Sequence, residues 1–267
     1  MNLPLNLTDL EYSKNNGIAV ATLNRPDSLN AFRQQTFTDL NAVLEDVRTD
    51  EAMRVLILTG NGRAFSAGAD LKELGASILT SSLEDQRKNL EMYQSLTRTM
   101  LALPKTIVCA VNGLAVGVGV EIALASDIRI ASSDASFTFA EAKRGLFQTN
   151  GVMFLLPRLI GAGRAAHIML TGERVLADRA LEYGMVTQVV EPDHLENVAL
   201  ELARTIAANA PISVRLVKQV LQQSLEGTLE QSLELETAGM LECLASQDLI
   251  EGTTAFIEKR IPVYQDR

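Results

Sequence analysis

Short apolar segments alternate with amphipathic helical segments over roughly the first 190 residues of this chain. Residues 18–23, 55–59 and 106–111 are nearly continuous apolar runs, as expected of strands that are buried on both faces. Residues 32–47 have helical spacing, and a second helical pattern precedes residue 106. The alternation predicts an α/β core of buried parallel strands, with active loops at the carboxyl ends of those strands.

Further strands are expected at 127–131, 136–139 and 185–190, and helices at 151–160 and 163–171.

From Asp193 onward the pattern is entirely helical, so we divide the chain into a core at 1–192 and a C-terminal helical region at 193–267. These helices carry more apolar surface than a single layer covers. Packing against a neighbouring subunit and ordinary packing within the chain explain this surface about equally well.

Composition narrows the range of functions that the chain can have. The chain has 267 residues, 47% of them hydrophobic, enough for one large domain. Its net charge of -9 argues against nucleic acid as a ligand. Cys109 and Cys243 are expected to be reduced thiols, and the presence of only two histidines, His167 and His194, argues against a zinc site.

The N-terminus lacks the features of a signal peptide, and no apolar run is long enough to span a membrane, so we expect a cytoplasmic protein.

Two glutamates stand in apolar sequence twenty positions apart. Glu121 follows a glycine-rich turn that begins a helix, and Glu141 follows the strand-like residues 137–140. Most glutamates are solvated surface residues, but burial of a carboxylate raises its pKa and allows proton exchange near neutral pH. The pair therefore favours acid–base chemistry.

Three blocks carry a more specific signal: Leu23–Phe32, Gly60–Lys72 and Val111–Glu121. The third is not a dinucleotide fingerprint, because Ile122 stands where the third glycine would be. In this order and spacing the blocks resemble the crotonase superfamily, the enoyl-CoA hydratases and isomerases. The likeness extends over nearly the whole chain.

The resemblance implies a crotonase-like (ClpP/crotonase) spiral of ββα units, with C-terminal helices that assemble a homotrimer or a dimer of trimers. It assigns the backbone amides of Ala69 and Val118 to an oxyanion hole, which stabilises the enolate of a thioester. It also assigns Glu121 and Glu141 to the pair of acids that hold a water in hydratases.

For the coenzyme A part of the substrate, the resemblance implies contacts from one group of residues: Arg25, Leu29, Ala31, Ala67, Asp70, Leu71, Lys72 and Gly117. Without the motif, Arg25 and Lys72 would be read as solvated surface charges. No metal and no redox cofactor is expected, since coenzyme A belongs to the substrate.

Two departures from the family pattern concern acyl specificity. Val118 interrupts a run of glycines and is expected to narrow the acyl pocket, and residues 146–152 lack the usual glycine pair. The sequence thus predicts an enoyl-CoA hydratase that acts on an acyl-CoA thioester. The alternatives are an enoyl-CoA isomerase and a catalytically idle acyl-CoA-binding protein.

Overall fold

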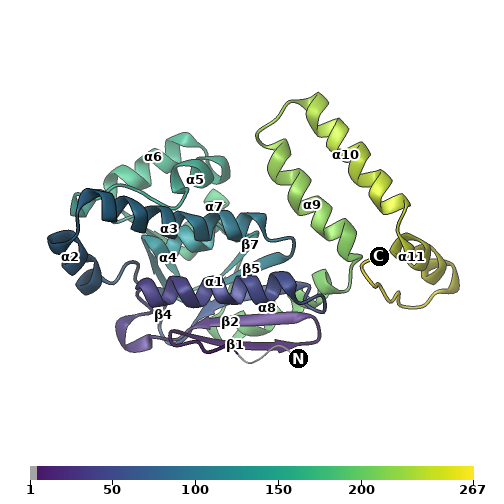
Figure 1. Ribbon diagram of the computed structural model, residues 1–267, viewed down its shortest axis with the longest axis horizontal. Coiled ribbons are helices and arrows are strands. Elements are labelled where there is room, and N and C mark those ends of the chain that lie inside the picture. Colours follow the sequence, from purple (N-terminus) through teal and green to yellow (C-terminus); the bar gives the residue numbers. More distant parts are fainter. Residues whose placement is uncertain (1–4) are drawn as a thin grey trace.

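Two sheets organise the structure (Figure 1). The computed structural model describes residues 5–267, apart from the side chain of residue 78. A six-stranded sheet has the order β1-β2-β3-β5-β7-β10, and a four-stranded sheet has the order β4-β6-β8-β9. Neighbouring strands are parallel, except in the antiparallel pairs β1–β2 and β8–β9. This arrangement confirms the α/β class.

The strands are β1 Leu10–Asn15, β2 Ile18–Leu23, β3 Val55–Gly60, β4 Ala64–Ser66, β5 Thr106–Val111, β6 Leu114–Val116, β7 Ile128–Ser132, β8 Ser136–Thr138, β9 Arg174–Leu176 and β10 Gln188–Val190. The helices are α1 Gln34–Thr49, α2 Leu71–Thr80, α3 Leu83–Ala102, α4 Val118–Leu124, α5 Val152–Ile160, α6 Ala162–Thr171, α7 Ala177–Tyr183, α8 Leu195–Ala207, α9 Pro211–Ser224, α10 Leu229–Leu244 and α11 Gln247–Glu258.

Helices cover both faces of the large sheet, which explains its continuous apolar strands. Leu56 and Leu58 of β3 belong to the core cluster that includes residues of α1 and α3. The alternate residues Val55 and Ile57 point to the other side, into the cluster that contains Ala199 of α8. The two-residue side-chain period of a strand thus places every second residue against a different helical layer.

Most predicted elements occur close to their expected positions, including the short strands β8 and β10, but several elements were missed. Strands at 18–23 and 106–111 and a helix ending at residue 160 occur where the pattern predicts them. The pattern missed β1, whose polar side chains face solvent, although Asn16 and Gly17 mark the hairpin turn by their φ angles of 50° and 79°. It also missed the strands β4, β6 and β9, which have three residues each, and the helices α2 and α7.

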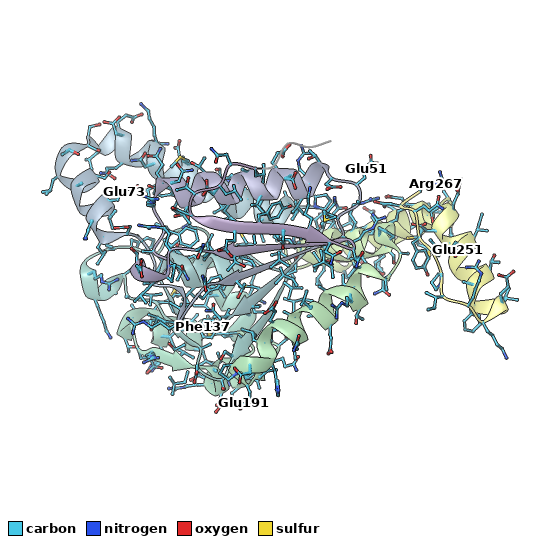
Figure 2. The ribbon with its side chains drawn as sticks, turned by 90° about the horizontal axis from the view of Figure 1, so that it is seen from below. Glu51, Glu73, Phe137, Glu191, Glu251 and Arg267 are labelled. Carbon is cyan, nitrogen blue, oxygen red and sulfur yellow. The ribbon has the colours of Figure 1, made fainter. Side chains whose placement is uncertain are left out.

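The last three helices extend away from the sheets (Figure 1 and Figure 2). Lys218 ties α9 to the core, because its ammonium group lies 2.8 Å from Asp127 Oδ2 and donates to the carbonyls of Met100 and Lys105. All of α10 lies in the described part of the chain, and none of its residues is buried. The exposed apolar side chains of this region include Leu221, Leu225, Leu229, Leu233, Met240, Leu241, Leu244 and Phe256.

The predicted boundary at residues 192 and 193 stays a prediction, and α8, which follows it, lies against the large sheet. Residues 1–4, which contributed to the signal-peptide argument, lie outside the described residues. In the part that the structure describes, no helix has both the length and the apolarity to cross a bilayer.

A buried ion pair fixes the start of α1. Asp9 is 1% exposed and accepts hydrogen bonds from Arg33 Nε at 2.9 Å, Arg33 Nη2 at 2.6 Å and Thr36 Oγ1 at 2.6 Å. Burial alone would raise the pKa of Asp9, but these hydrogen bonds and the positive charges of Arg33 and Arg25 outweigh burial and hold its pKa below 3.8. The carboxylate therefore stabilises the folded chain at neutral pH.

We expect Asp9→Asn to lower the free energy of unfolding at pH 7 by about 1–3 kcal/mol, because buried donors lose a charged acceptor. A carboxyl group whose pKa is lowered by folding contributes stability above its unfolded pKa and loses it as the pH falls through the folded pKa. Urea denaturation should therefore show the two proteins converging as the pH drops below about 4. Glu45→Gln, which removes an exposed pair with Arg48, is the control and should leave the urea midpoint unchanged.

Candidate active site

Three adjacent parallel strands of the small sheet carry the site on the loops at their carboxyl ends. β4 leads to Ala69, β6 leads to Val118, and β8 leads to Glu141. The β4–β6 and β6–β8 pairings are parallel, so all three loops leave the same edge of the sheet. Segments distant in the sequence are thereby brought together.

Glycines allow these loops to approach one another at backbone contact distance. A Cβ atom on Gly68 would lie 2.7 Å from the carbonyl oxygen of Val116, and one on Gly119 would lie 2.7 Å from that of Ser66. Gly117 has a φ of 49°, and a Cβ there would lie 2.6 Å from Glu141 Oε1. Only glycine fits these positions without displacing a neighbour.

Two backbone amides are left free by this arrangement. The amide of Phe32 donates to the Gly68 carbonyl, and the amide of Asp70 donates to the Phe32 carbonyl, both at 2.8 Å. The Ala69 amide between them has no acceptor within residues 5–267, and neither has the amide of Val118, the first residue of α4. Free donors of this kind can bind an oxyanion.

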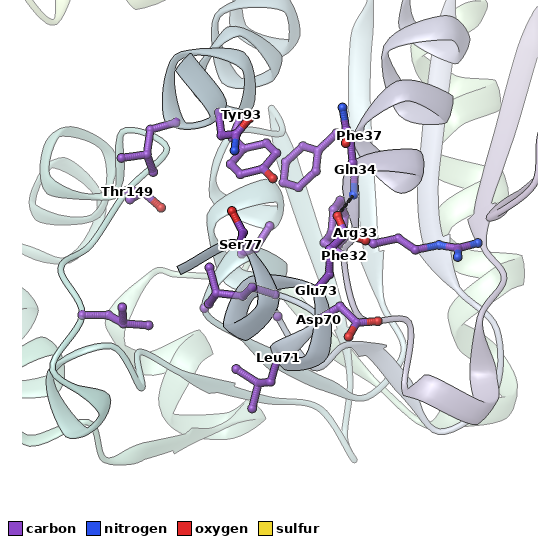
Figure 3. A pocket seen from close by; sticks show the side chains of 18 of the residues that line it. Phe32, Arg33, Gln34, Phe37, Asp70, Leu71, Glu73, Ser77, Tyr93 and Thr149 are labelled. Carbon is purple, nitrogen blue, oxygen red and sulfur yellow. Dashed lines mark hydrogen bonds between the residues drawn. The ribbon is translucent and has the colours of Figure 1, made fainter. Parts of the chain in front are cut away.

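Both amides border a cavity of about 720 Å³. Figure 3 shows that Phe37 and Tyr93 face each other on its wall, and the two rings stack with centroids 4.2 Å apart. Phe32 meets Phe37 edge to face at 5.2 Å. Glu73 of α2 is fixed by the amide of Gln34, which donates to its Oε1 at 2.8 Å (Figure 3). The cavity therefore combines an aromatic wall with polar groups at its rim.

The carboxylate of Glu121 is buried behind the cavity wall. Its side chain is 1% exposed and accepts hydrogen bonds from Asn150 Nδ2 at 2.7 Å and from the amide of Thr149 at 3.1 Å. The Thr149 hydroxyl lies 3.2 Å from each carboxylate oxygen. Burial raises the pKa of Glu121, the Glu141 charge raises it further, and the hydrogen bonds from Thr149 and Asn150 oppose the shift.

The carboxylate of Glu141 has a different environment. Glu141 is half-buried and lines the cavity. Its Oε2 atom is buried and has no hydrogen-bond partner among the described residues. One carboxylate is therefore held by protein donors, whereas the other has a free acceptor atom and lines the same cavity as the two free amides.

The structure brings most of the predicted site residues together. The cavity is lined by Ala67, Ala69, Asp70, Leu71, Gly117, Val118 and Glu141. Glu121 lies behind its wall, in contact with Thr149 and Asn150, which do line it.

Four of the residues assigned to coenzyme A do not border the cavity: Arg25, Leu29, Ala31 and Lys72. Arg25 is half-buried, lies 3.1 Å from Asp70 Oδ2 and donates to the Ala31 carbonyl, so it is not a solvated surface charge. The Leu29 carbonyl accepts from the Ala67 amide at 2.8 Å. Lys72 is exposed at the start of α2.

Sequence reasoning missed Thr149 and Asn150 as partners of Glu121. The signal was the dipeptide Asn150-Gly151, which predicts a turn, and both residues have left-handed φ angles of 48° and 80°. It also missed Phe37 and Tyr93, whose apolar spacing indicated only that they face the core.

Within residues 5–267, no three side chains of His, Cys, Asp or Glu are grouped so that they could hold a metal ion.

Known proteins resemble the chain over almost its full length. A sequence model of the enoyl-CoA hydratase/isomerase family matches residues 13–267. The short-chain-enoyl-CoA hydratase of Clostridium acetobutylicum is 36% identical, over 96% of this chain and 97% of that protein. The 1,2-epoxyphenylacetyl-CoA isomerase of Escherichia coli is 38% identical, over 93% and 95% respectively. The crystal structure of an enoyl-CoA hydratase from Bacillus anthracis superimposes with a TM-score of 0.93 at 35% identity, and covers 97% of this chain and 100% of that one.

Proposed function

The chain belongs to the enoyl-CoA hydratase/isomerase family, and from this premise we propose that it is an enoyl-CoA hydratase, which adds water across the 2,3 double bond of an enoyl-CoA thioester. One observation carries the proposal: the carboxylate of Glu141 and two free backbone amides border a single cavity, and a second carboxylate, that of Glu121, is buried behind its wall. Hydration needs both a group that takes a proton and a group that gives one, together with donors for the developing oxyanion.

The proposed reaction conserves atoms and charge. The oxygen of water bonds to carbon 3, and its proton passes to one glutamate. The electrons of the double bond move into the thioester carbonyl, whose oxygen accepts hydrogen bonds from the amides of Ala69 and Val118. The other glutamate then protonates carbon 2 of the enolate. Because the addition of water causes no net oxidation or reduction of the substrate, these steps need no redox cofactor.

Isomerisation is the second candidate, and the similarity to an isomerase favours keeping it. In that reaction one glutamate would move a proton between carbons, and no water would be added. A catalytically idle acyl-CoA-binding protein is the third candidate. The presence of two carboxylates, where isomerisation would need only one, favours hydration over the isomerase and over the idle protein.

Incubation with a panel of enoyl-CoA thioesters tests the proposal. Loss of the conjugated chromophore with formation of a 3-hydroxyacyl-CoA is the expected result. A product with a shifted double bond would support the isomerase instead, and no turnover with measurable binding would support the idle protein.

We expect Glu121→Gln and Glu141→Gln each to lower kcat by at least about 100-fold with a much smaller change in KM, because each carboxylate acts in proton transfer in the transition state. Steady-state kinetics with crotonyl-CoA measures both constants. Near-normal turnover in either variant would contradict the hydratase mechanism.

Gly117→Ala should lower kcat on the order of 100-fold or more, because the added methyl group would meet Glu141 Oε1 and displace the neighbouring Val118 amide. Gly145→Ala is the matched control. It has a φ of 70°, so alanine is strained there too, but a Cβ at that position meets nothing within 4 Å. If the two variants lose activity equally, backbone strain and not the contact with Glu141 is responsible.

We place the coenzyme A part of the substrate near α2, where Ala67, Asp70 and Leu71 border the cavity. Arg25 supports this wall through Asp70, and Leu29 and Ala31 support it through their backbone carbonyls. Lys72 directly follows Asp70 and Leu71 and is exposed. We expect its ammonium group to contact a phosphate of the coenzyme.

Lys72→Ala should raise KM for the thioester with little change in kcat, since binding of a remote phosphate stabilises the ground and transition states alike. Initial rates at varied thioester concentration give both constants, and Lys88→Ala, on the exposed face of α3, is the control. An unchanged KM for Lys72→Ala would mean that Lys72 is a solvated surface charge that does not bind the coenzyme.

We propose that the exposed apolar side chains of α9, α10 and α11 pack against other copies of the chain, in a homotrimer or a dimer of trimers. Light scattering of the purified protein measures the mass, and a monomer would contradict the assembly. We also propose a reducing, cytoplasmic setting, which suits the two free cysteines Cys109 and Cys243.

A further inference from the structure

The side chains of Thr149 and Asn150 contact the carboxylate oxygens of Glu121. Asn150 is 2% exposed, and its Nδ2 donates to Glu121 Oε2 at 2.7 Å. The Thr149 hydroxyl lies 3.2 Å from both oxygens and can donate to one of them at a time. Together with the Thr149 amide, these groups supply three donors to one buried carboxylate.

The segment that carries these donors is itself fixed. The Asn150 carbonyl accepts from the hydroxyl of Thr97, a buried residue of α3, at 3.1 Å. Asn150 has a left-handed φ of 48°, a conformation that asparagine tolerates better than most residues. The backbone is thus anchored to α3 while the side chain points to the carboxylate of α4.

The donors distinguish the two protonation states of Glu121. An amide N–H binds a carboxylate anion more strongly than a protonated carboxyl group, and hydrogen bonds to an ion are roughly twice as strong as neutral ones. Burial and the negative charge of Glu141 both favour the protonated form. A buried glutamate that must take a proton from water needs such donors to remain an anion.

We propose that Thr149 and Asn150 are positioning residues, whose side chains keep the Glu121 carboxylate ionised and hold it in one orientation for the addition of water. The assignment rests on the proposed hydratase function. It concerns the side chains specifically, because any residue at position 149 supplies a backbone amide.

Two pairs of variants separate this role from a purely structural one. Thr149→Val removes the hydroxyl at nearly constant shape, and Thr149→Ser retains it. Asn150→Gly removes the amide but accepts the left-handed backbone. Asn16→Gly is its control, because Asn16 has a φ of 50° in the exposed β1–β2 turn and does not line the cavity.

In hydration of crotonyl-CoA, Thr149→Val and Asn150→Gly should each lower kcat by about 10–100-fold with KM nearly unchanged. The acid limb of the pH profile of kcat/KM should move upward by about 1–2 pH units, because loss of a donor raises the pKa of a group that acts as the anion. Thr149→Ser and Asn16→Gly should keep the wild-type profile.

Unchanged kcat and an unchanged acid limb in Thr149→Val and Asn150→Gly would overturn the inference, even if both variants melt at lower temperature. Wild-type protein that hydrates no thioester would instead overturn the proposed function. Infrared titration of the Glu121 carboxyl band, identified by its loss in Glu121→Gln, then still tests the inference. The band should titrate at higher pH in Asn150→Gly than in the wild type, and equal midpoints would reject the positioning role.

Discussion

The site depends on the close approach of two backbone loops, the one after β4 and the one after β6. Gly68 and Gly119 make this approach possible, since a side chain on either would collide with a carbonyl oxygen of the other loop. The contact sets the free amides of Ala69 and Val118 beside one cavity. It also fixes the beginning of α4, and one turn later the amide of Glu121 donates to the Gly117 carbonyl at 2.9 Å. The position of the buried carboxylate therefore follows from the same glycines.

The two carboxylates differ in what surrounds them. Glu121 has lost nearly all contact with solvent and is held by Thr149 and Asn150, whereas Glu141 lines the cavity with an unpartnered oxygen. The proposed hydration needs one proton acceptor and one proton donor in the same site, and burial raises the pKa of Glu121. The asymmetry comes from tertiary structure. Glu121 lies on the buried helix α4, whereas Glu141 lies on the loop after β8, which is next to the edge strand β9.

The sequence predicted those parts of the fold and site that are local. Buried strands such as β5 and the glycine-rich loop before Glu121 are visible in a few consecutive residues. The partners of Glu121 were not predictable in this way, because 28 residues separate Thr149 from it and no periodicity links them. Arg25 was ambiguous for a related reason. Its pairing with Asp70 joins positions 45 residues apart, so the sequence did not show that this charge supports the wall of the cavity, and its contact with coenzyme A stays a prediction.

Buried polar atoms without partners are concentrated at the site. Five side-chain atoms of this kind occur among the described residues, and three of them belong to Glu141, Gln148 and Asn150. Each such atom costs about 1–3 kcal/mol of stability when nothing compensates for it. The left-handed backbone of Asn150 lowers the stability further. A chain selected for stability alone would replace these residues, so their clustering on the segment that follows β8 supports the proposed role of this segment in binding and proton transfer. The hydroxyl of Thr97 on α3, a helix packed in the main core cluster, holds this strained segment through the Asn150 carbonyl.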